Sequence, residues 1–392
     1  MLEIINKTDC CGCGACAMRC PKKCIDMKPD NEGFIYPSIN KELCVECGLC
    51  EKVCNVLHPY EKRKPISVIA ANSNNLKDRL LSSSGGVFTL IAEHVLSNDG
   101  VVFGARFDKD WQVVIDSTEN IKGLKCFRGS KYVQASTKNS FVECEKQLKS
   151  GRSVLYTGTP CQVSGLKHYL KRDYDNLLTV DFVCHGVPSP AIWGAYIREK
   201  FAKRNKIIKD VRFRDKNDEG WKAFHLAVDY EYNGEVYNSS SSQFEDPYMR
   251  AFLGNLILRP SCSNCQSKCN RSHSDITIAD YWGVEVEHPE LFDDKGTSLL
   301  LVNTSQGEEY LSHILQYIDY RDSSYEKALK HNCAISDSWP AHKKRDSFFK
   351  EVAKHGEIEK TIIKYLKPSL YQRIHILLAC IKNKIIKIIR SQ

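Results

Sequence analysis

Eight cysteines near the N-terminus fall into two runs of identical spacing. Each run follows the pattern C-x2-C-x2-C-x3-C, the first starting at Cys10 and the second at Cys44. Three cysteines on a tight loop can reach three corners of one iron–sulfur cubane, while the fourth, three residues further on, reaches the other cubane. The spacing therefore predicts two 4Fe–4S sites with crossed ligands. These are Cys10, Cys13 and Cys16 with Cys54, and Cys44, Cys47 and Cys50 with Cys20.

The alternative is a pair of zinc sites, since zinc also binds four thiolates. Two complete runs of four cysteines favour iron–sulfur clusters over zinc. Residues 8–57 resemble the bacterial two-cluster 4Fe–4S ferredoxins, with Pro21 following the first run as is usual. The second run departs from that pattern because Asn55 takes the place of proline. Cys11 and Cys24 lie outside both runs, and we expect them to be spare buried thiols.

More cysteines lie further along the chain, where they are more widely spaced. Cys161 and Cys184 each follow a predicted strand, and Cys262 and Cys265 form a C-x2-C pair before Cys269. Isolated cysteines are mostly small buried apolar residues. Two at strand ends together with a C-x2-C pair could instead hold a third cluster or a zinc ion.

Two glycine-containing turns could bind phosphate. Residues 82–86, Ser-Ser-Ser-Gly-Gly, precede a predicted helix, whose free N–H groups favour anions. Residues 128–132 then offer a cation pair and a ring that could stack on a cofactor. The alternatives are an ordinary helix cap and a solvated surface turn. The chain has neither G-x-G-x-x-G nor a Walker A motif, so a standard NAD-binding unit and a P-loop are not supported.

Length and composition set the class of protein. The 392 residues predict two or three domains, and 42% hydrophobic with 27% charged residues is typical of a folded chain. Nineteen cysteines without a secretory signal lead us to expect a reducing cytoplasm. The net charge is +8, but residues 361–392 carry seven basic and no acidic residues, which leaves 8 − 7 = +1 elsewhere. A broad nucleic-acid-binding face is therefore disfavoured.

Hydrophobic periodicity and the positions of proline and glycine divide the chain into segments. We predict an α+β or α/β multidomain protein with a two-cluster module over 1–57, a linker over 58–65 and a mixed-sheet body. Two domains are expected within that body, at 66–150 and 151–355. Strand–loop–helix units predict a partly parallel sheet with ligands at the strand ends. Two alternating runs around Asn233-Gly234 predict a hairpin over 224–238.

A basic helical tail is expected over 356–392. Six apolar residues recur at helical spacing over 374–388, flanked by lysine and arginine. Such a helix can lie on an anionic membrane surface, which would place the protein at the inner membrane face. The alternative is a terminal helix docked on the core with a solvated basic face.

Several strings in residues 66–340 together resemble the family of coenzyme F420 hydrogenase/dehydrogenase beta subunits. They are SSSGGVF, RGSKYVQ, YTGTPCQVSGL, VDFVCHGVPSP, RPSCSNC, SDITIADYWG and DDKGTSLLLVNT. The resemblance implies an iron–sulfur flavoprotein with FAD and a 4Fe–4S cluster in the body. That cluster would use Cys161, Cys184, Cys262 and Cys265, with Cys269 as a possible substitute. The implied FAD site uses Ser84, Gly85, Gly86, Arg128, Ser130, Lys131, Tyr132, Gln134, Thr159 and Pro160, with Asp280 and Trp282 near the flavin or the cluster.

The resemblance implies an oxidoreductase. Electrons would pass between an external one-electron carrier of ferredoxin type, the clusters, FAD and a hydride-accepting small substrate. A flavin joins one-electron and two-electron chemistry. The substrate would be deazaflavin-like or sugar-related, with surface-polysaccharide synthesis as one setting. The alternatives are a non-catalytic electron-transfer subunit and a cluster-bearing structural or nucleic-acid-binding protein. We expect His185 to be either a proton donor at the substrate or a histidine bonded to backbone beside the cluster.

Overall fold

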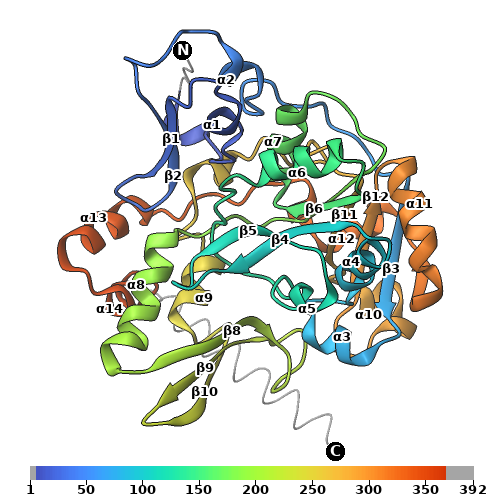
Figure 1. Ribbon diagram of the computed structural model, residues 1–392. Helices are drawn as coiled ribbons and strands as arrows, with labels where there is room; N and C mark the ends of the chain where they lie inside the picture. The colour runs from blue at the N-terminus through green and yellow to red at the C-terminus, as the bar shows by residue number, and fades with distance from the viewer. Residues whose placement is uncertain (1–5, 368–392) are drawn as a thin grey trace, which may run out of the picture.

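The computed structural model describes residues 6–367, and the helix expected over 374–388 lies outside them. A small cysteine-rich module stands on a larger α/β body, at the top left of Figure 1. An eight-stranded mixed sheet forms the centre of the body, which confirms the predicted fold class. In spatial order its strands are β13 (Ile318–Asp322), β3 (Ser67–Ser73), β12 (Ser298–Val302), β11 (Ile276–Asp280), β7 (Leu177–Phe182), β6 (Val154–Gly158), β4 (Val101–Phe107) and β5 (Val113–Thr118).

The sheet is parallel in its middle and antiparallel at its ends. β11, β7, β6 and β4 run parallel, as the strand–loop–helix units predict, while β5, β12, β3 and β13 are antiparallel to their neighbours. Residues from both predicted body domains contribute strands, so 66–150 and 151–355 share one sheet.

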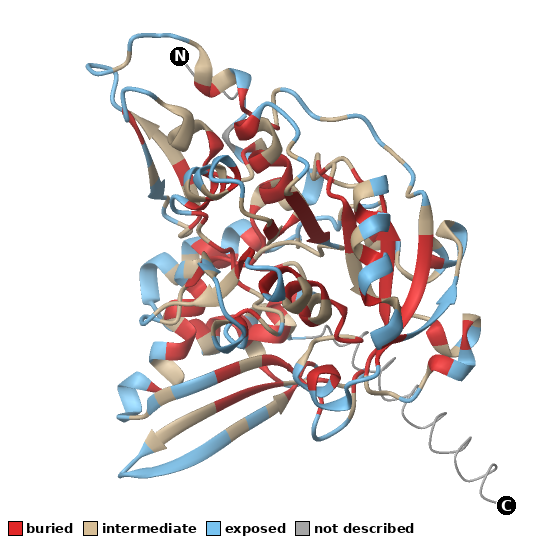
Figure 2. Ribbon diagram, turned by 45° about the vertical axis from the view of Figure 1, so that its right-hand side comes forward, coloured by how far each residue is buried: buried red, intermediate tan, exposed pale blue. Residues whose placement is uncertain are grey.

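Side-chain alternation along the strands separates two apolar layers. Leu155 of β6 faces one layer, whereas Val154 and Tyr156 face the other. This period of two places every second residue on the same face of a strand. Figure 2 shows the buried strands at the centre of the body, surrounded by helices that are exposed on their outer sides.

Fourteen α-helices connect and cover the sheets within the described part of the chain. Their bounds are α1 (Ala15–Arg19), α2 (Leu49–Lys52), α3 (Leu76–Leu81), α4 (Val87–Ser97), α5 (Ile121–Leu124), α6 (Ser140–Lys149), α7 (Pro160–Leu170), α8 (Pro190–Lys200), α9 (Pro247–Leu253), α10 (Val284–Glu287), α11 (Ser305–Ile314), α12 (Tyr325–His331), α13 (Arg345–His355) and α14 (Ile358–Tyr365).

A second sheet of three antiparallel strands lies at the bottom of Figure 1. It contains β8 (Ile207–Asp215), β9 (His225–Tyr232) and β10 (Glu235–Ser242). Asn233 and Gly234 join β9 to β10 with φ angles of +53° and +85°. Two left-handed residues are what a two-residue hairpin turn requires, and the structure has the hairpin predicted there.

The N-terminal module is built on a hairpin of β1 (Ile25–Pro29) and β2 (Ile35–Ile39). Its helix α1 packs against α2 within the module and against α6 and α7 of the body. The segment predicted as a linker follows the body surface, where the Tyr60 ring stacks on His273 with centroids 4.1 Å apart.

The first part of the predicted tail is docked on the body. Helix α14 buries Ile358 and Ile362 and packs against α8, α9 and α13. Within residues 6–367, no helix combines the length and the apolar character needed to cross a membrane.

Candidate functional site

The four cysteines predicted for the first cluster surround one pocket. Cys10, Cys13, Cys16 and Cys54 line it, together with Gly12 and Gly14. Both glycines have positive φ, +71° and +79°, which other residues rarely adopt. They let the loop curl around the pocket. The pocket thus gathers the set that the crossed-ligand prediction requires. We call it the inner site.

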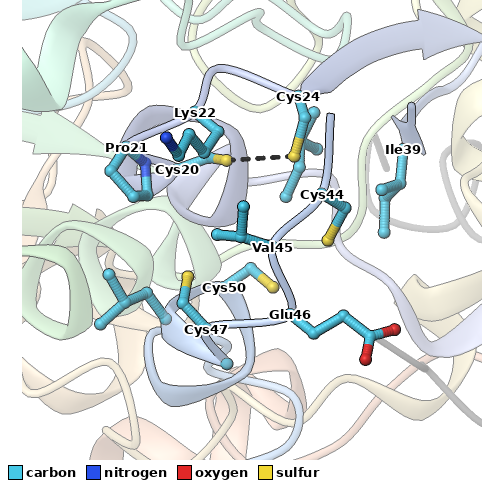
Figure 3. A pocket seen from close by; sticks show the side chains of 13 residues that line it. Cys20, Pro21, Lys22, Cys24, Ile39, Cys44, Val45, Glu46, Cys47 and Cys50 are labelled. Atoms are coloured by element: carbon cyan, nitrogen blue, oxygen red, sulfur yellow. Dashed lines mark hydrogen bonds between the residues drawn. The ribbon is translucent and has the colours of Figure 1, made fainter. Parts of the chain in front are cut away.

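The second pocket gathers the other predicted set. Cys44, Cys47 and Cys50 of the second run meet Cys20 of the first, as Figure 3 shows. The thiol of Cys24, which we expected to be spare, lies 3.4 Å from the Cys20 sulfur and also lines this pocket. Cys47 is exposed, so this pocket faces solvent more than the first. We call it the outer site.

Burial keeps the inner-site thiols protonated in the absence of a cation. It raises the pKa of Cys10 to about 11, and it raises the pKa of Cys54 as well. Metal ligation requires thiolate, so binding at this site releases protons. Within residues 6–367, no three His, Cys, Asp or Glu side chains converge closely enough to hold a single metal ion.

A third group of thiols lies in the body beside the inner site. Burial, followed by the nearby Cys184 and Cys265, raises the pKa of Cys262 to about 12. A hydrogen bond with Cys11, followed by burial, raises the pKa of Cys161 well above its usual range, and Cys265 adds to this effect. We call Cys161, Cys184, Cys262 and Cys265 the body site.

Cys269, the possible substitute ligand, points elsewhere. Its sulfur donates to the Ser336 carbonyl at 3.6 Å. Beside the body site, the Lys268 ammonium donates to the carbonyls of Cys184 and Ala334, both at 2.6 Å. This half-buried cation is close to the thiols, and sequence reasoning did not identify it.

Three residues that sequence reasoning missed tie the inner site to the body. Arg259 is 1% exposed and donates to the Cys10 carbonyl at 2.8 Å. Thr137 donates to the Cys13 carbonyl at 2.9 Å, and Asn55 donates to the Cys161 carbonyl at 2.9 Å. An arginine just before the C-x2-C pair and an asparagine in the usual proline position were the available signals.

The predicted flavin residues separate into two places. Thr159 lies at the body site, where its hydroxyl is 3.2 Å from the Cys161 sulfur, and Pro160 begins α7 beside it. Gln134 lies at the inner site and donates to the Cys11 carbonyl at 3.3 Å. These three residues are therefore placed with cysteines and apart from the serine–glycine turn.

Two of the other predicted flavin residues, Ser130 and Tyr132, lie around a buried arginine. The Arg214 guanidinium donates to both oxygens of Asp280, to the Tyr132 hydroxyl at 3.1 Å and to the Ser83 carbonyl at 3.2 Å. The N–H of Ser130 donates to the Ser83 hydroxyl at 2.7 Å. We call Ser83, Ser130, Lys131, Tyr132, Arg214 and Asp280 the polar cradle. Trp282 stacks on Trp221 next to it, with centroids 4.8 Å apart.

One predicted phosphate contact already has carboxylate partners, although its Nε–H is buried without an acceptor. Arg128 is paired with Asp78 at 2.9 Å and with Glu93 at 3.3 Å. The N–H of Gly85 donates to the Ser298 hydroxyl, and the Ser84 hydroxyl donates to the Thr297 carbonyl. The serine–glycine turn is thus held against β12, and Gly86 begins α4 with a φ of +89°. These hydrogen bonds use donors of the turn within the protein, so the turn has a structural role.

His185 lies between aromatic rings next to the body site. Its Nε2 is 2.7 Å from the Asn255 side-chain oxygen, and its ring is 5.1 Å from Phe252 and 5.5 Å from Trp339. Phe252 in turn stacks on Tyr132 of the polar cradle at 4.4 Å. A row of three rings therefore runs from the body site to the cradle.

Two four-cysteine pockets on a ferredoxin-like module, seated on an α/β body with further thiols, are the arrangement of an iron–sulfur electron-transfer protein. Comparison with known families agrees. Residues 9–57 match the 4Fe-4S dicluster domain, and residues 151–324 match the C-terminal part of the coenzyme F420 hydrogenase/dehydrogenase beta subunits. These matches bear out the resemblance that the sequence strings predicted, over residues 151–324 of the body and over the two-cluster domain in front of it.

Individual relatives are distant. The F component of the F(420)H(2) dehydrogenase of Methanosarcina mazei is 25% identical over 177 residues, which cover 41% of this chain and 48% of that protein. The chain thus matches about half the length of this curated relative. One chain of the xenon-derivatised F420-reducing NiFe hydrogenase complex from Methanosarcina barkeri aligns with this protein with a TM-score of 0.43 and 18% sequence identity. The alignment covers 77% of this protein and 91% of that chain.

Proposed function

We propose that this protein moves single electrons between an external carrier and a flavin-dependent reaction in its body. The observation that carries the proposal is the contact between the inner site and the body site, made through Asn55 and Cys161. Three 4Fe–4S clusters would supply one-electron transfer, and a flavin would pair those electrons for hydride chemistry. The protein's own residues supply twelve thiols, their spacing and their burial.

The exposure of the three cysteine sites supports electron transfer in the order outer site, inner site, body site. Cys47 is exposed at the outer site, and the neighbouring Leu43 and Val45 are 55% and 58% exposed. Apolar side chains around an exposed thiol suit transient contact with a carrier protein. Cys10, Cys13 and Cys54 of the inner site are buried and Gly165 of α7 lies against Cys13, which favours electron exchange with the other sites of the chain.

The polar cradle supports a flavin through its donors. Lys131 donates only to the carbonyls of Arg128 and Gly129, so its charge has no carboxylate partner among the described residues. The Arg214 Nε is buried without a hydrogen-bond partner. A phosphate supplies the counter-charge that Lys131 lacks and the acceptor that the Arg214 Nε lacks. We therefore place the FAD phosphates at Lys131, Ser130 and Arg214. Arg128 is a further candidate, because its Nε is also buried without an acceptor while Asp78 and Glu93 pair with its other nitrogen.

The contacts of His185 support a structural role over a catalytic one. Its ring is held by Asn255 and two aromatic rings, and Phe252 separates it from the cradle. Burial also lowers the pKa of His185, so the ring is neutral at pH 7. The His185→Gln variant should therefore retain substrate turnover.

The substrate class follows from the family alone. A deazaflavin such as coenzyme F420 is the first candidate, because the matched family and the M. mazei relative are both named for F420. A second candidate function is that of a non-catalytic subunit, which the M. mazei relative favours because that protein is named as a subunit of a dehydrogenase. A sugar-related substrate, a cytoplasmic location and membrane contact remain predictions from the sequence.

Anaerobic purification followed by iron, sulfide and flavin analysis tests the proposal. We expect about twelve irons, from three four-iron clusters, and one flavin per chain. About eight irons would remove the body cluster, and zinc in place of iron would overturn the redox function. Reduction of F420 by the isolated, flavin-loaded chain would distinguish the enzyme from the non-catalytic subunit.

A further inference from the structure

We propose that the free edge of β10 pairs with the same edge of a second copy of this protein. The two strands would run antiparallel about a twofold axis at Asn238, and two three-stranded sheets would join into one sheet of six strands. This interaction surface is independent of the proposed clusters and flavin, because no residue of the cysteine sites or of the polar cradle lies on β10.

Strand β10 lies at the outer side of its sheet, at the bottom of Figure 1. Its eight residues pair with β9 in one unbroken register, and Val236 is 69% exposed. The strand contains no proline, no lysine or arginine and no bulge, which are features that protect a free sheet edge from pairing with another chain. The edge of β10 is therefore open to a further strand.

The other edges of the two sheets in the body are protected. Strand β8, at the opposite edge of the small sheet, has two register shifts against β9 and contains Lys209. In the large sheet, β5 is covered by Ser136, whose N–H donates to the Val113 carbonyl at 2.9 Å. Strand β13, at the far edge, is short, and three of its five residues are charged. Within residues 6–367, β10 is thus the one edge of these sheets that lacks such protection.

Alternate residues of β10 turn their main-chain groups away from β9. Tyr232 and Glu235 flank the two-residue turn, and residues in that position exchange both hydrogen bonds with each other. The N–H and C=O groups of Val236, Asn238 and Ser240 therefore point outward. In the described part of the chain, no main-chain group outside the ladder bonds to them. A strand paired here would form six main-chain hydrogen bonds.

A second copy of β10 fits this edge because the edge is complementary to itself. With the axis at Asn238, Val236 lies opposite Ser240 of the second copy, and the six outward groups of one strand meet the same six groups of the other. Tyr237, which is 41% exposed, lies diagonally opposite Tyr237 of the second copy. Aromatic side chains reach each other across such a diagonal, so this pair would add apolar contact to the main-chain bonds.

The charges around β10 also permit a second copy. Glu235 is the single charged residue of the strand, and it would lie opposite Ser241 of the second copy. On the neighbouring strand, Asp229 is paired with Arg212 at 2.6 Å and Glu231 is paired with Lys209 at 2.8 Å. The strand therefore presents little repulsion to its own copy, and nothing along it selects a strongly charged peptide.

The paired edges make a small interface. Six main-chain hydrogen bonds with few apolar side chains fall at the low end of interface size, where complexes are weak and transient. We therefore expect a dimer with a dissociation constant on the order of 10 μM.

Sedimentation equilibrium of the full chain, from low micromolar to submillimolar concentration, measures this dissociation constant. The protein is kept free of oxygen, so that its nineteen cysteines form no disulfide between copies. Hydrogen exchange of the segment 235–242 is followed at the same concentrations, because pairing protects its outward amides.

Two variants of Val236 act on the edge in different ways. Val236→Pro removes one outward N–H and leaves the hydrogen bonds to β9 in place. Val236→Glu places a carboxylate opposite Ser240 of the second copy, whose hydroxyl already donates to Asp218 at 2.8 Å. Val286→Glu is the matched control, because Val286 is 64% exposed on α10, outside both sheets.

We expect the wild-type chain to dimerise with rising concentration and its 235–242 segment to exchange more slowly as it does so. Val236→Pro and Val236→Glu should each raise the dissociation constant at least about tenfold. Both should keep the circular dichroism spectrum of the folded monomer, and Val286→Glu should dimerise like the wild type.

Three results would overturn the inference. A wild-type chain that stays monomeric, with exchange of 235–242 independent of concentration, would leave the edge to solvent or to a different chain. A dimer that persists in both Val236 variants would place the interface elsewhere. Equal weakening by Val286→Glu would show a general effect of added charge. None of these results bears on the proposed function, which iron and flavin analysis tests separately.

Discussion

The guanidinium of Arg259 donates its Nε–H to the carbonyl of Cys10 at 2.8 Å, across the contact between the body and the cysteine module. Its other nitrogens donate to Gln134 and to the Ile35 carbonyl, both at 3.0 Å. Among the described residues no carboxylate lies within ion-pair distance of it. A buried cation is costly unless an opposite charge compensates it. Clusters ligated by thiolates carry net negative charge, so the cation fits a protein loaded with iron.

Replacing Arg259 should therefore change both stability and redox potential. Arg259→Met leaves the Cys10 and Ile35 carbonyls and the Gln134 side-chain oxygen without this donor, at roughly 1–3 kcal/mol for each buried acceptor, so the thermal midpoint of unfolding should fall. The loss of positive charge should also lower the potential of the inner cluster in an anaerobic redox titration. Arg259→Lys keeps the charge and should show the smaller potential shift.

Arg345→Met is the matched control for Arg259. Arg345 is also buried at the contact with the cysteine module, but it is paired with Glu32. This control should lose stability with little change in potential. Equal potential shifts in the two variants would contradict the charge argument.

Gly165 of α7 should tolerate no side chain. A Cβ at Gly165 would lie 2.9 Å from both the Cβ and the sulfur of Cys13, which is closer than real contacts. We expect Gly165→Ala to push Cys13 out of place and to deplete the inner site of iron, with loss of about one four-iron cluster. Gly194→Ala in α8 is the control, because its Cβ would meet only the flexible ends of the Gln112 and Arg198 side chains. Full iron content in Gly165→Ala would show that α7 can move away from the loop.

The crossed ligand sets predict which cluster each fourth cysteine serves. Cys54 belongs to the second run in sequence but lines the pocket of the first. Cys54→Ser should therefore perturb the inner cluster, and Cys20→Ser should perturb the outer one. Electron paramagnetic resonance of each variant, with iron analysis, assigns the lost or altered signal. Loss of the outer signal in Cys54→Ser would mean that each run holds its own cluster.

Spacing predicted which cysteines line each pocket, because a short loop leaves little choice of geometry. The four-residue sets of both pockets follow from the fixed reach of the loops around Gly12 and Gly48. Arg259 and Asn55 were not predicted as contacts, since each acts on a segment far away in the chain. Arg259 is separated from Cys10 by 249 residues, and no local pattern encodes such a pairing.

The flavin prediction was also limited by contacts between distant segments of the chain. Arg128 has the residue type suited to phosphate, yet Asp78 and Glu93 of α3 and α4 neutralise it. The buried Arg214 at the end of β8 could not be singled out, because its partner Asp280 lies on another sheet. Strand and helix positions were predictable from periodicity, whereas the sharing of one sheet by 66–150 and 151–355 depends on tertiary pairing.

Phosphate binding at the cradle should depend on the charge of Lys131. Burial lowers the pKa of Lys131 to about 8, so the free protein has the ammonium at pH 7 and mostly the neutral amine at pH 9. A bound phosphate favours the ammonium, so binding above pH 8 must first take up a proton. The dissociation constant for FAD should therefore rise about tenfold between pH 7 and pH 9.

Titration of the flavin-depleted chain with FAD, followed by fluorescence, measures this dissociation constant. Lys131→Arg should remain charged and bind equally at both pH values, while Lys131→Met should bind weakly at both. Equal affinity of the wild-type protein for FAD at pH 7 and pH 9 would show that Lys131 does not bind the phosphate and that the flavin does not bind at the cradle.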